Sequence, residues 1–144
     1  NLLLENVTFN DNDELEITWM WDTNAEIQTS IVQASSDNIT FSDVDVSSPS
    51  IPLDARVTYT YAEHNANNAK QFFTIKTIDA CDTIATSNYG SSIFLQAENF
   101  LNGNALTWTP FDIEQGTVLE YKVHQVTERS REAGHPLQCT MEEA

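Results

Sequence analysis

One short stretch of the sequence groups side chains that could bind a metal ion. The letters "NDNDE" at residues 10–14 place Asp11, Asp13 and Glu14 close together in the chain. Carboxylate oxygens are the ligands that Ca²⁺ prefers. These three residues are therefore candidate calcium ligands, and we otherwise expect no cofactor. The alternative is an ordinary turn, because Asn and Asp tolerate left-handed conformations and hydrogen-bond their own backbone.

Motifs for catalysis are missing from the sequence. It contains no GxSxG or HExxH motif, and its four glycines are too scattered to form a phosphate-binding loop. The three histidines, His64, His124 and His135, lie on separate segments, so we do not expect them to cooperate. We therefore expect that the protein is not an enzyme.

Trp21 is the best candidate for contact with a ligand. An exposed indole could stack on a sugar ring and so bind a glycan. However, Trp21 lies two residues after Trp19, which places both on one face of a strand. The alternative that we favour is that both tryptophans belong to the core.

The chain contains only two cysteines, Cys81 and Cys139. They are too few for a disulfide framework, and their spacing does not match a zinc site. One hypothesis is a single disulfide between them. The alternative for Cys81 is a small, buried apolar side chain at the end of a strand.

The chain is strongly acidic, with 22 acidic and six basic residues and a formal net charge of −16. This charge repels polyanions, so we expect no nucleic-acid partner. No apolar run approaches the roughly 20 residues that cross a bilayer, and we expect no membrane insertion. The abundance of Asn, Thr and Ser favours an extracellular or cell-surface location. Since the chain begins at Asn1 rather than Met, we expect a processed product or an excised fragment.

Apolar and polar residues alternate along most of the chain, which is typical of half-buried β-strands. In "ELEITWMWD", Leu15, Ile17 and Trp19 fall on one face and Glu16 and Thr18 on the other. No segment has helical periodicity together with a cap. We predict an all-β, antiparallel sandwich with strands in the ranges 2–9, 14–22, 27–35, 39–46, 55–63, 70–80, 83–87 and 91–96.

The second part of the chain begins the pattern again. Leu106-Thr107-Trp108 repeats Ile17-Thr18-Trp19 after 89 residues, and an aspartate, Asp112 or Asp22, follows each tryptophan. A repeat of about 90 residues has the length of a small sandwich module. We predict a complete module at 1–92, a partial second module at 93–127 and a tail or linker at 128–144, rather than the three strands that would complete the second module. The segment at residues 76–96 then serves as a hinge between repeats.

This segment resembles tandem fibronectin type III-like repeats of Bacteroidetes surface proteins, which are associated with gliding motility and type IX secretion. The residues that carry the resemblance are Phe73, Ile75, Lys76, Ile78, Asp79, Cys81, Ser87, Asn88, Ser92, Ile93 and Leu95. The sequence departs from the repeats at Asp82, where they usually have glycine. Asp82-Thr83-Ile84 also resembles the O-glycosylation acceptor of Bacteroidetes, which implies a glycan on Thr83.

The resemblance implies a non-catalytic, structural or adhesive repeat of a larger secreted or surface protein, acting as a spacer and stacking unit. Its partners would be adjacent modules of the same polypeptide. Because the second module is incomplete, a strand from another subunit could complete it, giving a homo-oligomer or polymer. The alternatives are a glycan- or calcium-binding module, or an accessory domain of an extracellular enzyme.

Overall fold

The computed structural model describes residues 2–21, 26–47, 56–124 and 138–143. These residues form β-strands and turns, and among them no helix is long and apolar enough to cross a membrane. The chain divides into two compact units, Asn1–Glu114 and Gln115–Ala144.

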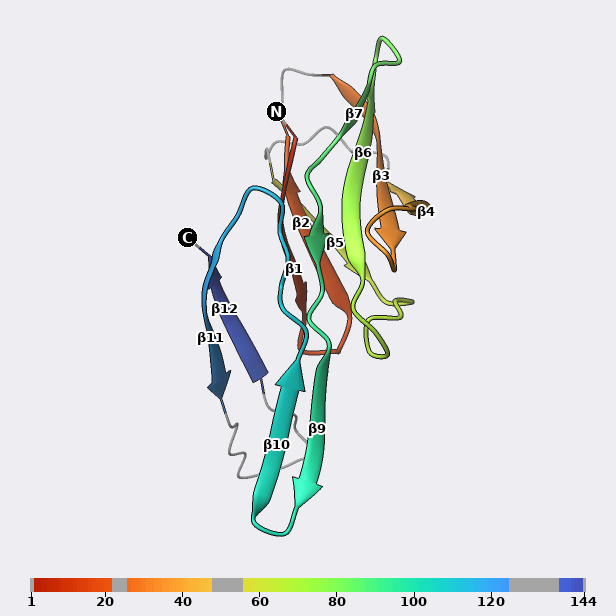
Figure 1. The fold of residues 1–144 in the computed structure, drawn as a ribbon. Coiled ribbons are helices and arrows are strands. Elements are labelled where there is room, and N and C mark those ends of the chain that lie inside the picture. Colours follow the sequence, from red (N-terminus) through yellow and green to blue (C-terminus); the bar gives the residue numbers. More distant parts are fainter. Residues whose placement is uncertain (1, 22–25, 48–55, 125–137, 144) are drawn as a thin grey trace. The chain divides into compact units, whose positions relative to one another are not determined.

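One sheet of the first unit has three antiparallel strands, β1 (Leu3–Phe9), β2 (Leu15–Met20) and β5 (Arg56–Tyr61), in the order β1-β2-β5 (Figure 1). The alternation in β2 has the predicted effect, because Leu15, Ile17 and Trp19 are fully buried. Trp19 lies opposite Leu4 of β1 and Val57 of β5. The middle strand thus directs its apolar face into the core.

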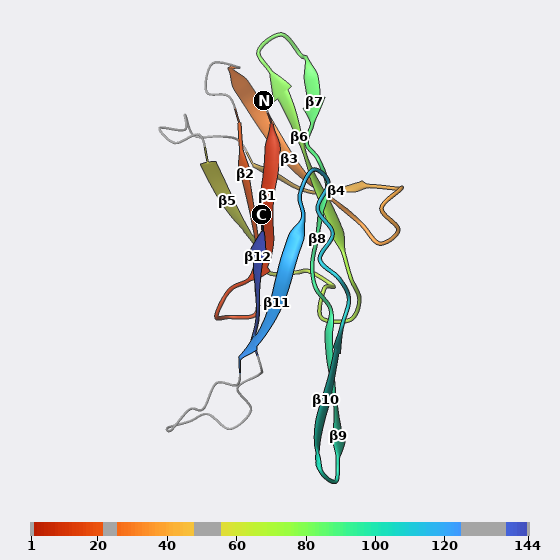
Figure 2. The same ribbon diagram turned by 60° about the vertical axis from the view of Figure 1, so that its left-hand side comes forward.

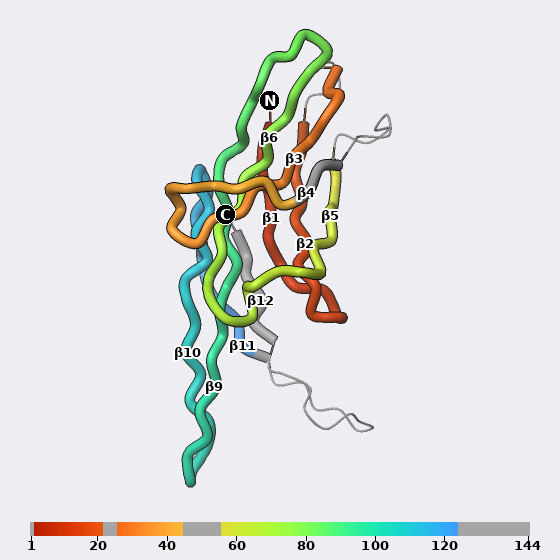
Figure 3. Tube along the Cα trace, turned by 90° about the vertical axis from the view of Figure 1, so that its right-hand side faces the viewer, coloured from red at the N-terminus to blue at the C-terminus, as the bar shows by residue number. Residues whose placement is uncertain are grey.

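The other sheet runs in the order β4-β3-β6-β7, with β3 (Ile27–Ser35), β4 (Ser42–Ser47), β6 (Phe72–Asp79) and β7 (Ile84–Thr86). A short strand, β8 (Gly90–Ser91), also pairs with β6. Figure 3 shows β3 and β6 as one layer and β1, β2 and β5 as the other. Val32, Phe73 and Ile75 of this sheet are fully buried. Each such side chain contributes about 1.5–3 kcal/mol by leaving water. The predicted all-β, antiparallel sandwich is confirmed.

The first unit also contains a hairpin of β9 (Leu95–Phe100) and β10 (Gly103–Trp108). Figures 1 and 2 show it extending away from the sheets on the side of the β1–β2 loop. The single strand predicted at 91–96 is divided between β8 and β9. The division occurs because Ser92 hydrogen-bonds to Gln71, the residue just before β6, whereas the chain from Leu95 onward pairs with β10.

The second unit contains the antiparallel pair β11 (Val118–His124) and β12 (Gln138–Glu143). Strand β12 lies within residues 128–144, the range expected to be a tail or linker. Cys139 and Met141 alternate with polar residues over only six positions, a signal too short to recognise without β11 as a partner. The proposed module boundary at residue 92 stays a prediction.

Candidate functional site

The three predicted calcium ligands lie in the loop that joins β1 to β2. Asn10 closes this loop: its side-chain oxygen accepts hydrogen bonds from the amides of Asn12 and Glu14 at 2.9 and 3.0 Å. Its side-chain amide donates to the Glu14 carboxylate at 2.9 Å. Asp13 has a φ of 61°, in the left-handed region, and both Asp11 and Asp13 are exposed. These are the features of a turn that caps itself.

The described residues include no group of three or more His, Cys, Asp or Glu side chains that could hold a metal ion. Asp11, Asp13 and Glu14 are all among those residues, so their carboxylates do not converge. Calcium binding here stays a prediction, and calorimetric titration with Ca²⁺ and melting with and without EDTA test it.

His64 connects the same loop to the chain between β5 and β6. Its Nδ1 accepts a hydrogen bond from the amide of Ala66 at 3.2 Å, and its Nε2 lies 2.8 Å from the carbonyl oxygen of Asp13. Since a carbonyl can only accept, the network assigns the proton to Nε2. The ring also contacts Phe9 and Tyr61 edge-on, at centroid distances of 5.4 and 6.2 Å. His64 therefore connects the β1–β2 loop to the chain between β5 and β6 and has a structural role.

Trp21 is only 5% exposed and directly follows β2, two residues after the fully buried Trp19. A sugar platform would need an exposed indole face, which the structure does not offer at this position. Trp21 thus belongs to the core, as the favoured alternative had it. Neither indole N–H has a hydrogen-bond partner among the described residues.

Thr83 and Cys81 lie in the turn between β6 and β7, and both are exposed. The Asp79 carboxylate accepts hydrogen bonds from the amides of Thr83 and Cys81, each at 2.8 Å. These bonds lower the pKa of Asp79, with Thr83 making the largest contribution. Asp82 has a φ of 59°, the conformation that favours glycine. A glycan on Thr83 stays a prediction, but the residue is accessible.

The interpretation of Cys81 as a buried apolar residue is wrong, because Cys81 is exposed. Cys81 lies in the β6–β7 turn, where its backbone amide donates a hydrogen bond to the Asp79 carboxylate. Cys139 lies on β12 in the second unit, and its side chain is outside the described residues. The disulfide between them stays a prediction, which a count of free thiols in the native protein tests.

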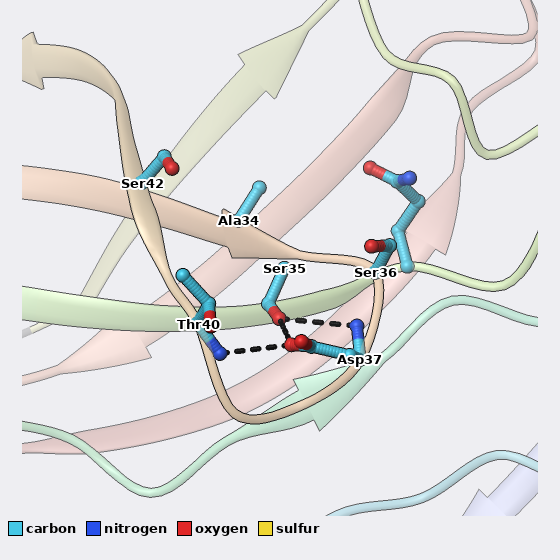
Figure 4. A pocket seen from close by; sticks show the side chains of 7 residues that line it. Ala34, Ser35, Ser36, Asp37, Thr40 and Ser42 are labelled. Atoms are coloured by element: carbon cyan, nitrogen blue, oxygen red, sulfur yellow. Dashed lines mark hydrogen bonds between the residues drawn. The ribbon is translucent and has the colours of Figure 1, made fainter.

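A shallow hollow of about 350 Å³ lies beside the β3–β4 loop, lined by small polar residues and Gln71 (Figure 4). Its only charged group, Asp37, accepts hydrogen bonds from the amides of Thr40 and Ile39, each at 2.8 Å, and from the Ser35 hydroxyl at 2.7 Å. The amide of Thr40 is the largest of the causes that lower the pKa of Asp37 to about 2. A carboxylate with so low a pKa is a poor general base near neutral pH. The Asp37 carboxylate is also already hydrogen-bonded within the β3–β4 loop.

The densest set of buried polar contacts follows β7, in the segment "SNYGSS" at residues 87–92. Asn88 is buried there. Its side-chain oxygen accepts a hydrogen bond from the amide of Leu4 at 2.8 Å, and its side-chain amide donates to the carbonyls of Leu4 and Glu114, each at 3.0 Å. The Ser87 hydroxyl accepts from the amide of Ile75 and donates to the Asn88 carbonyl. One side chain thus joins β1 to the chain after β10.

Ser91 and Ser92 also make buried hydrogen bonds, each to a different segment of the chain. The Ser92 hydroxyl accepts from the amide of Gln71 at 2.9 Å, while the Ser91 hydroxyl accepts from the amide of Asp112 at 2.8 Å. Their own amides donate back to the carbonyls of the same two residues, each at 2.8 Å. Lys70 pairs with the Asp112 carboxylate. We call residues 87–92 together with Lys70 and Gln71 the serine seam.

The sequence predicts a hinge around residues 87–92 and does not predict the contacts of the serine seam. The available signal was a run of small polar residues between two apolar segments, which is also typical of solvent-exposed loops. Burial of Ser87, Asn88, Ser91 and Ser92 distinguishes the seam from such a loop. Their partners are too distant in sequence to be predicted from it.

Comparisons of the chain with protein-family models, with curated proteins and with solved structures found no match.

Proposed function

We propose that the chain is a non-catalytic, structural or adhesive β-sandwich repeat of a larger secreted or cell-surface protein, in which it acts as a spacer and stacking unit. The proposal includes the resemblance to tandem fibronectin type III-like repeats of Bacteroidetes surface proteins. The packing of a three-stranded antiparallel sheet with a five-stranded one, in which the short β8 is the fifth strand, supports this part.

The observation that carries the proposal is the likeness between two hairpins in the first unit. In the β1–β2 hairpin, Trp19 lies directly opposite Leu4. In the β9–β10 hairpin, Trp108 lies directly opposite Leu95. Because both tryptophans occur in the same Thr-Trp context, the second hairpin has the expected form of the first two strands of another repeat.

Surface exposure of the protein tests this role. Antibodies against the chain should label intact cells of the source organism as strongly as permeabilised cells, because a spacer of a surface protein is accessible from outside. An antibody against a cytoplasmic protein provides the control, since it should label only permeabilised cells. Labelling by the first antibody only after permeabilisation would overturn the proposal.

The proposal extends to self-association by strand addition, because β10 pairs only with β9 among the described residues. Strand β10 contains no charged residue to discourage such pairing. At the tip of the hairpin, Phe100 is 60% exposed and Leu101 is fully exposed. Sedimentation velocity over a wide concentration range should therefore show association that Thr107→Lys abolishes. A monomer at every concentration would remove this extension and leave the spacer role intact.

A further inference from the structure

The serine seam has a partner segment, residues 111–114, which follows the β9–β10 hairpin. Ser91 exchanges two hydrogen bonds with Asp112, and Gly90 forms an isolated bridge with Ile113. The amide of Glu114 donates to the carbonyl of Tyr89 at 3.0 Å. The segment therefore adds to the edge of the first sandwich as a short strand would.

Side chains give this contact chemical selectivity. Phe111 is buried, with 3% of its surface exposed, and anchors the segment. Lys70 pairs with Asp112, and the lysine side chain is 17% exposed. Only six residues of this acidic chain are basic, so a shielded lysine at this point favours an aspartate in the partner.

The position of residues 111–114 in the repeat pattern indicates which parts of the protein this contact joins. Residues 111–114 come just after Trp108, as the chain after β2 comes just after Trp19. With the repeat boundary predicted at residue 92, the seam belongs to the first repeat and the segment to the start of the next, although both lie in the same compact unit. This chain therefore contains both halves of a contact between consecutive repeats.

We infer that the serine seam is a docking site for the following repeat, which presents an aromatic residue and an aspartate after its second strand. The contact holds β9–β10 in one orientation relative to the first sandwich, so the junction is stiff and is not the hinge expected from the sequence. This inference rests on the proposed function as a stacked repeat and specifies the surface through which stacking occurs.

Nuclear magnetic resonance on the full chain tests the stiffness directly. Residual dipolar couplings from β9 and β10 should fit the same alignment tensor as those from β2, β3 and β6. A separate tensor for the hairpin, or strongly averaged couplings there, would overturn the inference.

Amide hydrogen exchange tests whether the ion pair between Lys70 and Asp112 holds the contact together. Lys70→Met removes the charge and retains an apolar stem, so the amides of Ser91 and Glu114 should exchange at least tenfold faster, while the core amide of Ile75 is unchanged. Lys76→Met is the matched control: its ion pair with Asp43 spans 3.8 Å elsewhere in the sandwich, and it should leave Ser91 and Glu114 unaffected. Exchange unchanged in Lys70→Met, or accelerated equally at Ile75, would contradict the inference.

A double variant shows whether the two charged side chains act together. Lys70→Met combined with Asp112→Asn should accelerate exchange no more than either single change, because each removes the same ion pair. Additive increases in the exchange rate would contradict a direct interaction between Lys70 and Asp112. These measurements need only the isolated chain. A flexible junction would remove this inference and leave the proposed function, whereas absent surface labelling would remove the proposed function and leave only a stiff contact within this chain.

Discussion

Asn88 binds both main-chain groups of Leu4, a residue 84 positions earlier in the chain. Leu4 lies on β1, an edge strand, at the point where the pairing of β1 with β2 is irregular. The asparagine therefore satisfies a backbone amide and a carbonyl that β2 leaves unpaired. It also covers part of an edge that would otherwise be open to another strand.

Replacing Asn88 with alanine should be strongly destabilising. The change leaves the buried amide and carbonyl of Leu4 without partners, which costs about 2–3 kcal/mol of unfolding free energy. Urea unfolding followed by tryptophan fluorescence measures the loss. Asn67→Ala is the control, because Asn67 is exposed, and it should change stability by no more than about 0.5 kcal/mol. Equal stabilities of the two variants would contradict the role of Asn88.

Replacing Gly90 with alanine should force a collision inside the seam. An added Cβ would lie 2.5 Å from Leu4 Cδ2 and 3.4 Å from Val7 Cγ2, and both of these side chains are buried. Such overpacking costs about 1–3 kcal/mol. The matched background is Leu4→Val, whose shorter side chain should reduce the cost of Gly90→Ala. A cost that is the same in both backgrounds would show that Leu4 is not the obstacle.

Replacing Asp82 with glycine should stabilise the β6–β7 turn. Asp82 has a φ of 59°, and glycine adopts this left-handed conformation without the steric cost of a Cβ. We expect a gain of about 0.5–1 kcal/mol in unfolding free energy, measured by urea unfolding. Asp11→Gly removes a similar exposed acid from a turn position that does not have positive φ, so it should give no gain. A loss of stability in Asp82→Gly would contradict this account.

The contribution of Asp37 should depend on pH in a defined direction. Its pKa in the folded protein is lowered to about 2, chiefly by the amide of Thr40, so folding favours the charged form. The stabilisation is therefore present above the ordinary Asp pKa of about 4 and is lost as the pH falls towards 2. The melting temperature of Asp37→Ala should lie below that of the unchanged protein at pH 6, and the difference should narrow between about pH 4 and pH 2. A difference in melting temperature that stays constant between pH 6 and pH 2 would exclude a contribution from the ionisation of Asp37.

The sequence predicted much of the sandwich because strand formation follows a local pattern. Alternation around Ile17 and Trp19 placed β2 and its buried face correctly, and the ranges predicted for β1, β3 and β6 overlap the observed strands closely. Turn residues also had local explanations: Asn10, Asp37 and Asp79 each bind amides a few positions away. Such interactions act over a few residues, so they can be recognised in the sequence itself.

Tertiary structure decided which polar residues were buried and with what partners. Asn88 and Ser91 resemble loop residues until sheet register places Leu4 and Asp112 beside them. Conversely, Cys81 resembles a buried residue but is exposed in the β6–β7 turn. The physical reason is that a hydrogen bond or ion pair requires two atoms to meet within about 3 Å, and for these residues the meeting depends on how strands far apart in the chain pack. The alternating pattern determined the strands, while their packing determined the seam.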